Sequence, residues 1–201
     1  MDFFPAVAAS GWTSGLSAYG TVLVLGLLGR LGIGQVPEVL SRPGILIAAG
    51  ILFATEFIVD KVPYLDNLWD AAHTVIRPVI AGFVGVQFAG DADALGEAVS
   101  AVGAGSMALA SHAVKAGLRL AVNTSPEPFS TIAVSTVEDL LMAGVSYLVA
   151  TQPWVAFGIA AVLLAGGILL LIAIRRRIAR FLERIRNRPP GSRALRPRLR
   201  P

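Results

Sequence analysis

The sequence has no cysteine, and it has few charged residues for its length of 201. The absence of cysteine excludes disulfide bonds and thiolate metal sites, so packing and polar contacts alone must hold the fold. Charged residues make up 15% of the chain and apolar residues 55%, and the mean hydropathy is +0.69. This composition excludes an ordinary soluble domain and predicts an integral membrane protein.

The chain also lacks the local motifs of common enzyme classes. It contains no nucleotide-binding loop, nucleophile elbow or zincin helix, and its scattered glycines are typical of helix packing. We therefore expect a protein that is not an enzyme and that needs no cofactor.

Six apolar stretches predict an all-α, polytopic transmembrane helical bundle. They cover approximately residues 7–29, 44–59, 71–89, 98–122, 132–150 and 154–174. Because about twenty residues cross the hydrocarbon layer, the second and third stretches predict short, kinked or partly re-entrant helices, and five spans is the alternative count. Three stretches precede the acidic loop 91–97 and three follow it, an arrangement that would allow a 3+3 inverted repeat.

Positive charge gathers at the C-terminus, where residues 175–201 hold eleven of the seventeen basic residues and one acid. This contrast predicts a transmembrane domain over 1–174 and an arginine-rich tail, amphipathic over 175–186 and disordered over 187–201. Basic residues beside a span favour the cytoplasm, and an even span count then places the N-terminus there too. Anionic lipid headgroups are the expected partner of the tail. Nucleic acid is not expected, because no aromatic residue accompanies the last arginines.

Two clusters of ionisable residues interrupt the apolar background. A charged side chain in or beside a membrane helix has a high free-energy cost unless it is paired or hydrated, and it is commonly retained because it has a function. These clusters are therefore the candidate functional site. The first cluster contains Glu56, Asp60, Lys61, Asp66, Asp70, His73 and Arg77, and the second contains His112, Lys115, Arg119, Glu138 and Asp139. Alternating spans bring the end of the second, the start of the third, the end of the fourth and the start of the fifth to one membrane face. The two clusters are therefore expected to meet.

Helical spacing supports this expectation. The residues from Asp66 to Arg77 recur at i, i+4, i+7 and i+11, and those from His112 to Arg119 recur at i, i+3 and i+7, so each set lies on one face of a helix. Three local features have structural interpretations: Ser135 and Glu138 fit a capping box, Pro78 predicts a kink that lines a cavity, and the GxxxG step that begins at Gly11 predicts close helix packing.

Several segments resemble a family of small bacterial membrane proteins known as a domain of unknown function. The resemblance rests on Gly15-Leu16-Ser17-Ala18-Tyr19, on Glu56-x3-Asp60-Lys61-x-Pro63-x2-Asp66, on Thr74-Val75-Ile76-Arg77-Pro78, and on His112-x2-Lys115 with Ser135-x2-Glu138-Asp139. It covers roughly residues 9–153. Where the family pattern has a glycine-rich turn, this chain has Ser125-Pro126-Glu127-Pro128. The resemblance implies a multi-pass protein of the bacterial inner membrane and no established activity.

Three functional hypotheses follow from the clusters. The first is a small-solute, ion-linked or proton-linked transporter or channel-like protein, whose charged cavity opens to the cytoplasm. The second is a structural or scaffold protein in which the same charges form a buried salt-bridge network. A lesser alternative is an enzyme that binds a lipid phosphate or a metal, with Asp66, Asp70 and His73 as metal ligands. Two hundred residues leave little room for a pore in one subunit, so a homodimer is also plausible.

Overall fold

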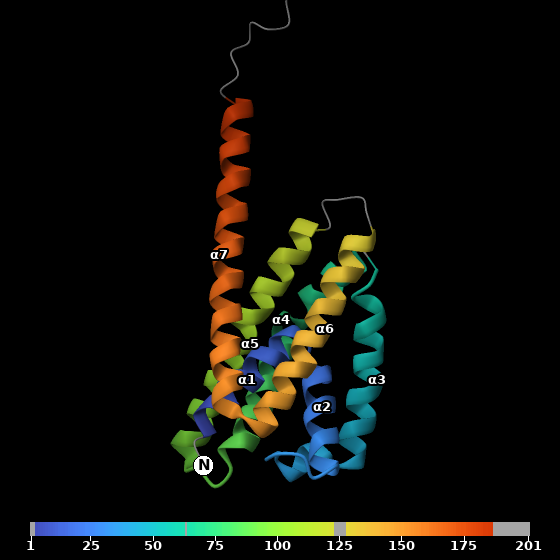
Figure 1. The fold of residues 1–201 in the computed structure, drawn as a ribbon, viewed down its shortest axis with the longest axis vertical. Coiled ribbons are helices and arrows are strands. Elements are labelled where there is room, and N and C mark those ends of the chain that lie inside the picture. The colour runs from blue at the N-terminus through green and yellow to red at the C-terminus, as the bar shows by residue number, and fades with distance from the viewer. Residues whose placement is uncertain (1–2, 63, 123–127, 187–201) are drawn as a thin grey trace, which may run out of the picture.

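The computed structural model of the protein describes residues 3–62, 64–122 and 128–186, and within these ranges it contains helices and no strand. The predicted all-α class is confirmed. The elements in chain order are α1 (Phe3–Leu16), α2 (Ala18–Arg30), the short 3-10 helix η1 (Glu38–Ser41), α3 (Pro43–Val59), α4 (Leu65–Ala89), α5 (Ala94–Val122), α6 (Pro128–Thr151) and α7 (Pro153–Arg186) (Figure 1).

The predicted spans from the second to the sixth correspond to α3, α4, α5, α6 and α7, which alternate in direction along the bundle (Figure 1). Among the described residues, four helices are long and apolar enough to cross a membrane, namely 65–89, 94–122, 129–151 and 153–181. Helix α3 is apolar but has 17 residues, which makes it short for a span. The chain is therefore that of a membrane protein, and the count of six spans stays a prediction.

The first apolar stretch was expected to form one continuous helix. It instead forms two helices that are separated at Ser17. Ser17 has extended backbone angles (φ −151°, ψ 110°) and caps α2 by accepting a hydrogen bond from the Gly20 amide at 3.0 Å. Helix α1 begins beside Phe157, where the ring of Phe4 packs at a centroid distance of 5.4 Å, and the chain after α2 reaches Ala150, whose carbonyl accepts from the Gln35 amide at 2.7 Å. Both outer ends therefore lie at one end of the bundle, and α1 and α2 form a re-entrant hairpin (Figure 1).

The hairpin also changes where the termini lie. The contact between Phe4 and Phe157 places the start of α1 beside the start of α7, whereas Arg186 lies at the far end of that 34-residue helix. At 1.5 Å per residue, α7 is about 50 Å long. The described chain ends thus lie at opposite ends of the bundle, and this arrangement does not support the prediction that both termini lie on one side of the membrane. The side of the membrane on which each terminus lies stays a prediction.

Small residues let α1 approach α5 closely. A Cβ atom added to Gly11 would collide with the backbone of Ala104, and one added to Gly15 would collide with the backbone of Ala108. Gly85 of α4 likewise leaves no room for a side chain beside Ala104. The packing role predicted for the GxxxG step is confirmed, and it brings the tip of the hairpin against the middle of the bundle.

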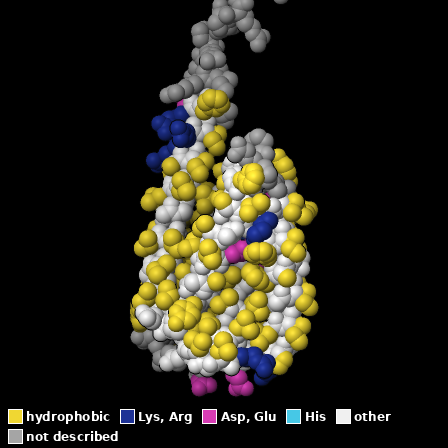
Figure 2. Space-filling view, turned by 45° about the vertical axis from the view of Figure 1, so that its right-hand side comes forward, with side chains coloured by type: hydrophobic (Ala, Val, Ile, Leu, Met, Phe, Trp, Pro, Cys, Tyr) yellow, Lys and Arg dark blue, Asp and Glu magenta, His cyan; other side chains and the backbone are white. Residues whose placement is uncertain are grey.

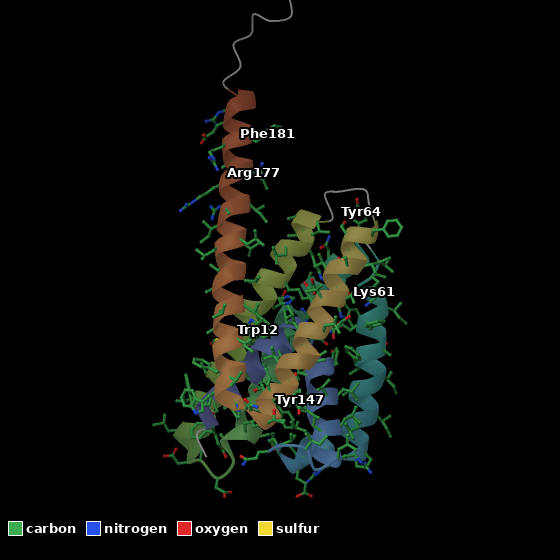
Figure 3. The ribbon with its side chains drawn as sticks, viewed as in Figure 1. Trp12, Lys61, Tyr64, Tyr147, Arg177 and Phe181 are labelled. Carbon is green, nitrogen blue, oxygen red and sulfur yellow. The ribbon has the colours of Figure 1, made fainter. Side chains whose placement is uncertain are left out.

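The end of α3, the start of α4, the end of α5 and the start of α6 gather at the other end of the bundle from the chain start (Figures 1 and 3). Pro78 lies inside α4, and the helix continues on both sides of it. Helix α7 extends past this end and carries the exposed residues Arg177 and Phe181 (Figure 3). Apolar side chains cover the face of the bundle in Figure 2, and basic side chains gather on the extension of α7. The turn predicted at 123–126 and the disordered tail at 187–201 lie outside the described residues.

Candidate functional site

The two polar stripes predicted from helical spacing lie on α4 and α5 and face each other. Their members are buried in the described structure, with exposed fractions of 4% or less, and they are Asp66, Asp70, His73 and Arg77 on α4 and His112, Lys115 and Arg119 on α5. The close approach of α4 and α5 puts these side chains within reach of one another. The end of α3 and the first half of α6 supply the remaining members of the site.

Arg77 is the centre of one half of the site. Its Nη2 atom is 2.7 Å from Glu56 Oε1 and 3.1 Å from Asp70 Oδ1, and its side chain has no exposed surface. Its Nη1 atom donates to the carbonyl of Gly15 at 3.1 Å and lies 2.5 Å from His112 Nδ1. Because His112 Nε2 is 3.0 Å from the carbonyl of Asp70, we assign the proton to Nε2, which leaves Nδ1 as the acceptor for Arg77.

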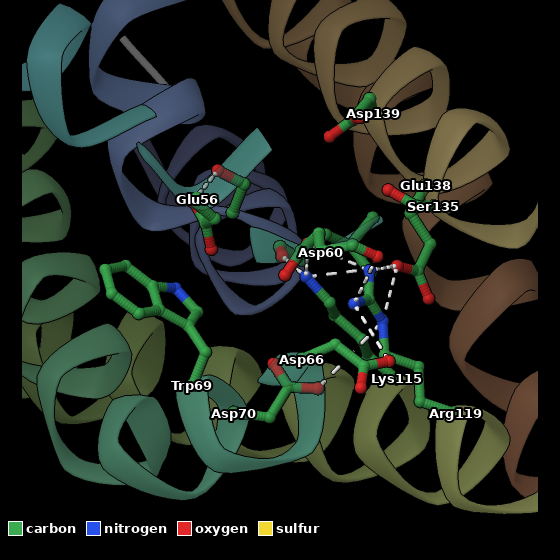
Figure 4. A network of polar contacts seen from close by, with 12 residues as sticks. Glu56, Asp60, Asp66, Trp69, Asp70, Lys115, Arg119, Ser135, Glu138 and Asp139 are labelled. Carbon is green, nitrogen blue, oxygen red and sulfur yellow. Dashed lines mark hydrogen bonds and ion pairs between the residues drawn. The ribbon is translucent and has the colours of Figure 1, made fainter. Parts of the chain in front are cut away.

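Arg119 and Lys115 form the other half. Arg119 Nη2 donates to Asp60 Oδ2 at 2.8 Å and to Glu138 Oε2 at 2.5 Å, and Arg119 Nη1 is 3.6 Å from Asp66 Oδ2. Lys115 Nζ donates to the same Asp60 oxygen at 2.8 Å (Figure 4). Asp60 is thus shared by two cations from one helix face, and Arg119 links this carboxylate at the end of α3 to Glu138 of α6.

The tip of the re-entrant hairpin closes the site from the middle of the bundle. The Gly15 carbonyl accepts from Arg77, and the Leu16 carbonyl accepts from Lys115 Nζ at 2.6 Å. The hydroxyl of Ser17 donates to Glu56 Oε2. The break in the helix therefore offers two carbonyl oxygens to cations and a hydroxyl to a carboxylate, which is how unwound backbone is satisfied inside a membrane protein.

Two groups from the predicted clusters lie beside this site rather than in it. Lys61 Nζ is 3.2 Å from Asp139 Oδ2 and 3.1 Å from the ring centroid of Phe57, and this pair is partly exposed. The ring of His73 stacks on Trp69, and its Nε2 atom is 3.1 Å from the hydroxyl of Tyr19. Lys61 and Asp139 form a rim, and His73 joins the site to α2.

Among the described residues of the site, carboxyl groups outnumber basic groups. Glu56, Asp60, Asp70 and Glu138 are carboxylates, whereas the cations are three, Arg77, Lys115 and Arg119. Asp66, which faces Arg119 as well, adds a further carboxylate.

Several buried polar atoms of the site also have no hydrogen bond among the described residues. Asp60 Oδ1, both oxygens of Asp70, Arg77 Nε and Trp69 Nε1 are buried without a hydrogen bond among the described residues. Such atoms normally find a partner, so their concentration beside the surplus carboxyl groups marks the site as unusual.

Two sequence-based interpretations of individual residues find no support in the structure. Glu138 does not cap a helix with Ser135, because α6 begins at Pro128 and both residues lie well inside it. Glu138 instead binds Arg119, as described above. The metal hypothesis for Asp66, Asp70 and His73 also lacks support, since the described part of the chain contains no group of three or more His, Asp or Glu side chains arranged to hold an ion.

Sequence reasoning missed the contribution of the hairpin tip. The backbone of Gly15 and Leu16 and the side chain of Ser17 contact the site, yet they lie in an apolar stretch long enough to span the bilayer. A serine between two glycines in that stretch, Gly15 and Gly20, was the available signal. It did not suffice, because serine also occurs inside membrane helices.

An all-helical apolar bundle that folds around buried ion pairs, with four helices long and apolar enough to cross a membrane, defines an integral membrane protein with a buried charged site. The family model described as Domain of unknown function (DUF4126) matches residues 5–173, and the chain belongs to this family. The match includes the hairpin and every charged residue of the site, and it ends just before Arg175. No curated protein and no solved structure matches the chain.

Proposed function

We propose that the protein is an ion-linked or proton-linked transport protein of the bacterial inner membrane, and that its charged site is closed in this conformation. The observation that carries the proposal is the excess of buried carboxylates over cations among the described residues. An uncompensated charge costs several kcal/mol in such a place, so protons or small cations would neutralise the excess. Their exchange with one side of the membrane would provide the coupling.

The broken helix supports the same proposal. Secondary transporters commonly bind their substrate or coupling ion near the middle of the bilayer, at discontinuous helices whose free carbonyls face the ion. Here the break between Leu16 and Ala18 offers two such carbonyls and lies against Glu56 and Asp60 through shared cations.

We propose that the site opens toward the cytoplasm. The basic residues Arg175, Arg176, Arg177 and Arg180 lie on α7 beyond the end of the bundle at which α3 ends and α4 begins. Basic residues beside a span favour the cytoplasmic side. The chain start would then face the periplasm, because the hairpin returns to the side from which it began.

The structural alternative is favoured by one observation. The side chains of Arg77, Lys115 and Arg119 are each 2% exposed or less, and every one of them has a carboxylate partner. A network of this kind can serve only to hold short helices together. Under this alternative, a protein that keeps its fold would carry no ions.

Reconstitution into liposomes separates these two functions. Vesicles holding a pH-sensitive dye would receive a potassium diffusion potential through valinomycin, with and without a sodium gradient. We expect proton movement above that of empty vesicles, with or without the sodium gradient, and at least a ten-fold loss in Glu56→Gln. Glu97→Gln is the matched control, because Glu97 is an exposed acid in the first turn of α5, far from the site. Absence of proton flux in folded protein, both with and without the sodium gradient, would favour the structural alternative.

A further inference from the structure

We infer that the Lys115 ammonium fills a binding site for a monovalent cation, and that an inorganic or small organic cation of ammonium size can replace it. This inference deepens the proposed function, on which it rests for the transport step, by naming the class of substrate. Three observations support it. They are the oxygen atoms around Lys115 Nζ, the Leu16 carbonyl that the helix break leaves without an amide donor, and the Asp60 oxygen that has no hydrogen bond among the described residues.

The ammonium group has the surroundings of a bound cation. Lys115 Nζ lies 2.6 Å from the carbonyl oxygen of Leu16, 2.8 Å from Asp60 Oδ2 and 3.9 Å from Glu138 Oε2. These oxygens come from three separate places, which are the hairpin tip, the end of α3 and α6. Backbone carbonyls and carboxylates are the ligands that hard monovalent cations use in membrane proteins. The described side chains form no group of three or more His, Asp or Glu that could hold a metal ion, but this donor set includes a main-chain carbonyl.

The Leu16 carbonyl is available because of the way the helix is broken. In a continuous helix this oxygen would accept from the amide of Gly20, four residues later. The Gly20 amide instead donates to Ser17 Oγ at 3.0 Å. The serine cap thus removes the ordinary donor and leaves the carbonyl for a cation in the middle of the bundle.

Asp60 has a carboxylate oxygen that could bind a cation in place of Lys115. Its Oδ2 atom serves both Lys115 and Arg119, while its Oδ1 atom is buried without a hydrogen bond among the described residues. Asp60 itself is 2% exposed. A cation that binds both carboxylate oxygens would use an acceptor that Lys115 leaves open.

Lys115 and Arg119 differ in how easily they can leave. Arg119 donates to Glu138 through two nitrogens and also to Asp60, so its planar group is fixed by several bonds. Lys115 carries a compact ammonium on a flexible stem. The Glu138 carboxylate, 3.9 Å away, offers the ammonium a second acceptor when it withdraws. Replacement by a free cation would keep the positive charge at Asp60.

The sequence allows a direct test, because Lys61 and Lys115 are its two lysines. The full-length protein would be methylated reductively in nanodiscs in choline chloride, and in potassium, sodium or rubidium chloride at equal ionic strength, because none of these cations reacts with formaldehyde. Mass spectrometry would follow each lysine. We expect Lys115 to be protected in choline and to react at least ten-fold faster with a cation that fits. Lys61, which is partly exposed, is the internal control and should react at one rate throughout. An equal Lys115 rate in all four salts, including no reaction in any, would overturn the inference.

A second measurement uses Lys115→Ala, which removes the built-in cation but keeps its oxygen ligands. We expect the thermal midpoint of this variant to rise with potassium or methylammonium relative to choline, and the midpoints of wild type and Lys61→Ala to rise less, because in them the Lys115 ammonium competes with the cation for the same oxygens. A thermal midpoint of Lys115→Ala that is the same in all salts would contradict the inference. If the variant does not fold, the methylation result decides. Ion flux with a cation-insensitive Lys115 would reject this inference alone. A cation-sensitive Lys115 without flux would reject the proposed transport and leave a cation site.

Discussion

The ion pair between Arg77 and Glu56 provides the sharpest test of the site, because both side chains are almost fully buried and their charged atoms lie 2.7 Å apart. Arg77→Met keeps much of the side-chain volume but removes the guanidinium. Glu56 and Asp70 then lose their cation, while the Gly15 carbonyl loses its donor. Removing one partner of a buried pair typically costs about 3–5 kcal/mol. The Coulomb energy of two charges about 4 Å apart at an effective dielectric constant of 20 is about 4 kcal/mol, which agrees.

Glu56→Gln should cost less, about 1–3 kcal/mol, because Arg77 keeps Asp70 as a partner and the amide can still accept a hydrogen bond. The double variant should be more stable than the sum of the two losses predicts, by about 1.5 kcal/mol or more, since one uncompensated carboxylate is absent. Asp70 still lacks its cation, so recovery will be partial.

The assay is the free energy of unfolding in mixed micelles, measured by SDS titration with circular dichroism. Arg30→Met is the matched control, because Arg30 is exposed at the end of α2, and its effect should stay within about 0.5 kcal/mol. A loss below about 1 kcal/mol for Arg77→Met, or additivity of the two substitutions within about 0.5 kcal/mol, would refute the account of a tightly coupled buried pair.

Three further predictions use the same assay. Ser17→Ala should lose about 1–3 kcal/mol, because Ser17 caps α2 and binds Glu56, whereas Ser14→Ala should be neutral or stabilising, because the buried Ser14 hydroxyl has no hydrogen-bond partner among the described residues. Gly15→Ala should cost about 1–3 kcal/mol through collision with α5, whereas Gly103→Ala, with open space around it, should be neutral or gain up to about 1 kcal/mol; equal effects would contradict the packing argument. Lys61→Gln should cost less than about 1 kcal/mol, because its pair with Asp139 is partly exposed, and a loss above 2 kcal/mol would place it in the buried network.

Hydropathy and helical spacing were sufficient to predict the bundle and the meeting of the two clusters. Alternating passes determine which helix ends share one end of the bundle, and the spacing from Asp66 to Arg77 determines that these residues share a face. Neither depends on tertiary detail. The individual ion pairs do depend on tertiary detail, since the sequence does not reveal the position of α3 along the axis of α4. Glu56 consequently binds Arg77 and Lys115 binds Asp60, partners that spacing alone could not assign.

Local motifs failed where tertiary structure took precedence. The Ser135 and Glu138 pattern fits a helix start, but α6 begins seven residues before Ser135 and the glutamate faces α5 instead. The stretch 7–29 has the length of a span, and its hydropathy does not register a turn. That turn is stabilised by residues 39 to 99 positions away, as the contacts of Ser17 with Glu56 and of Leu16 with Lys115 show. A window moved along the chain cannot detect such partners.

The broken helix and the charged site depend on each other. Free carbonyls inside a bilayer cost several kcal/mol unless a donor meets them, and Arg77 and Lys115 supply the donors at Gly15 and Leu16. The cations in turn need oxygen ligands beyond the carboxylates that they share. Their contact at 2.6–3.1 Å requires the tip of α1 to lie almost on α5, and the absence of a side chain at Gly15 permits that approach. A larger residue there would lift the carbonyls away from their donors, so it would weaken the ion-pair network without changing a single charge.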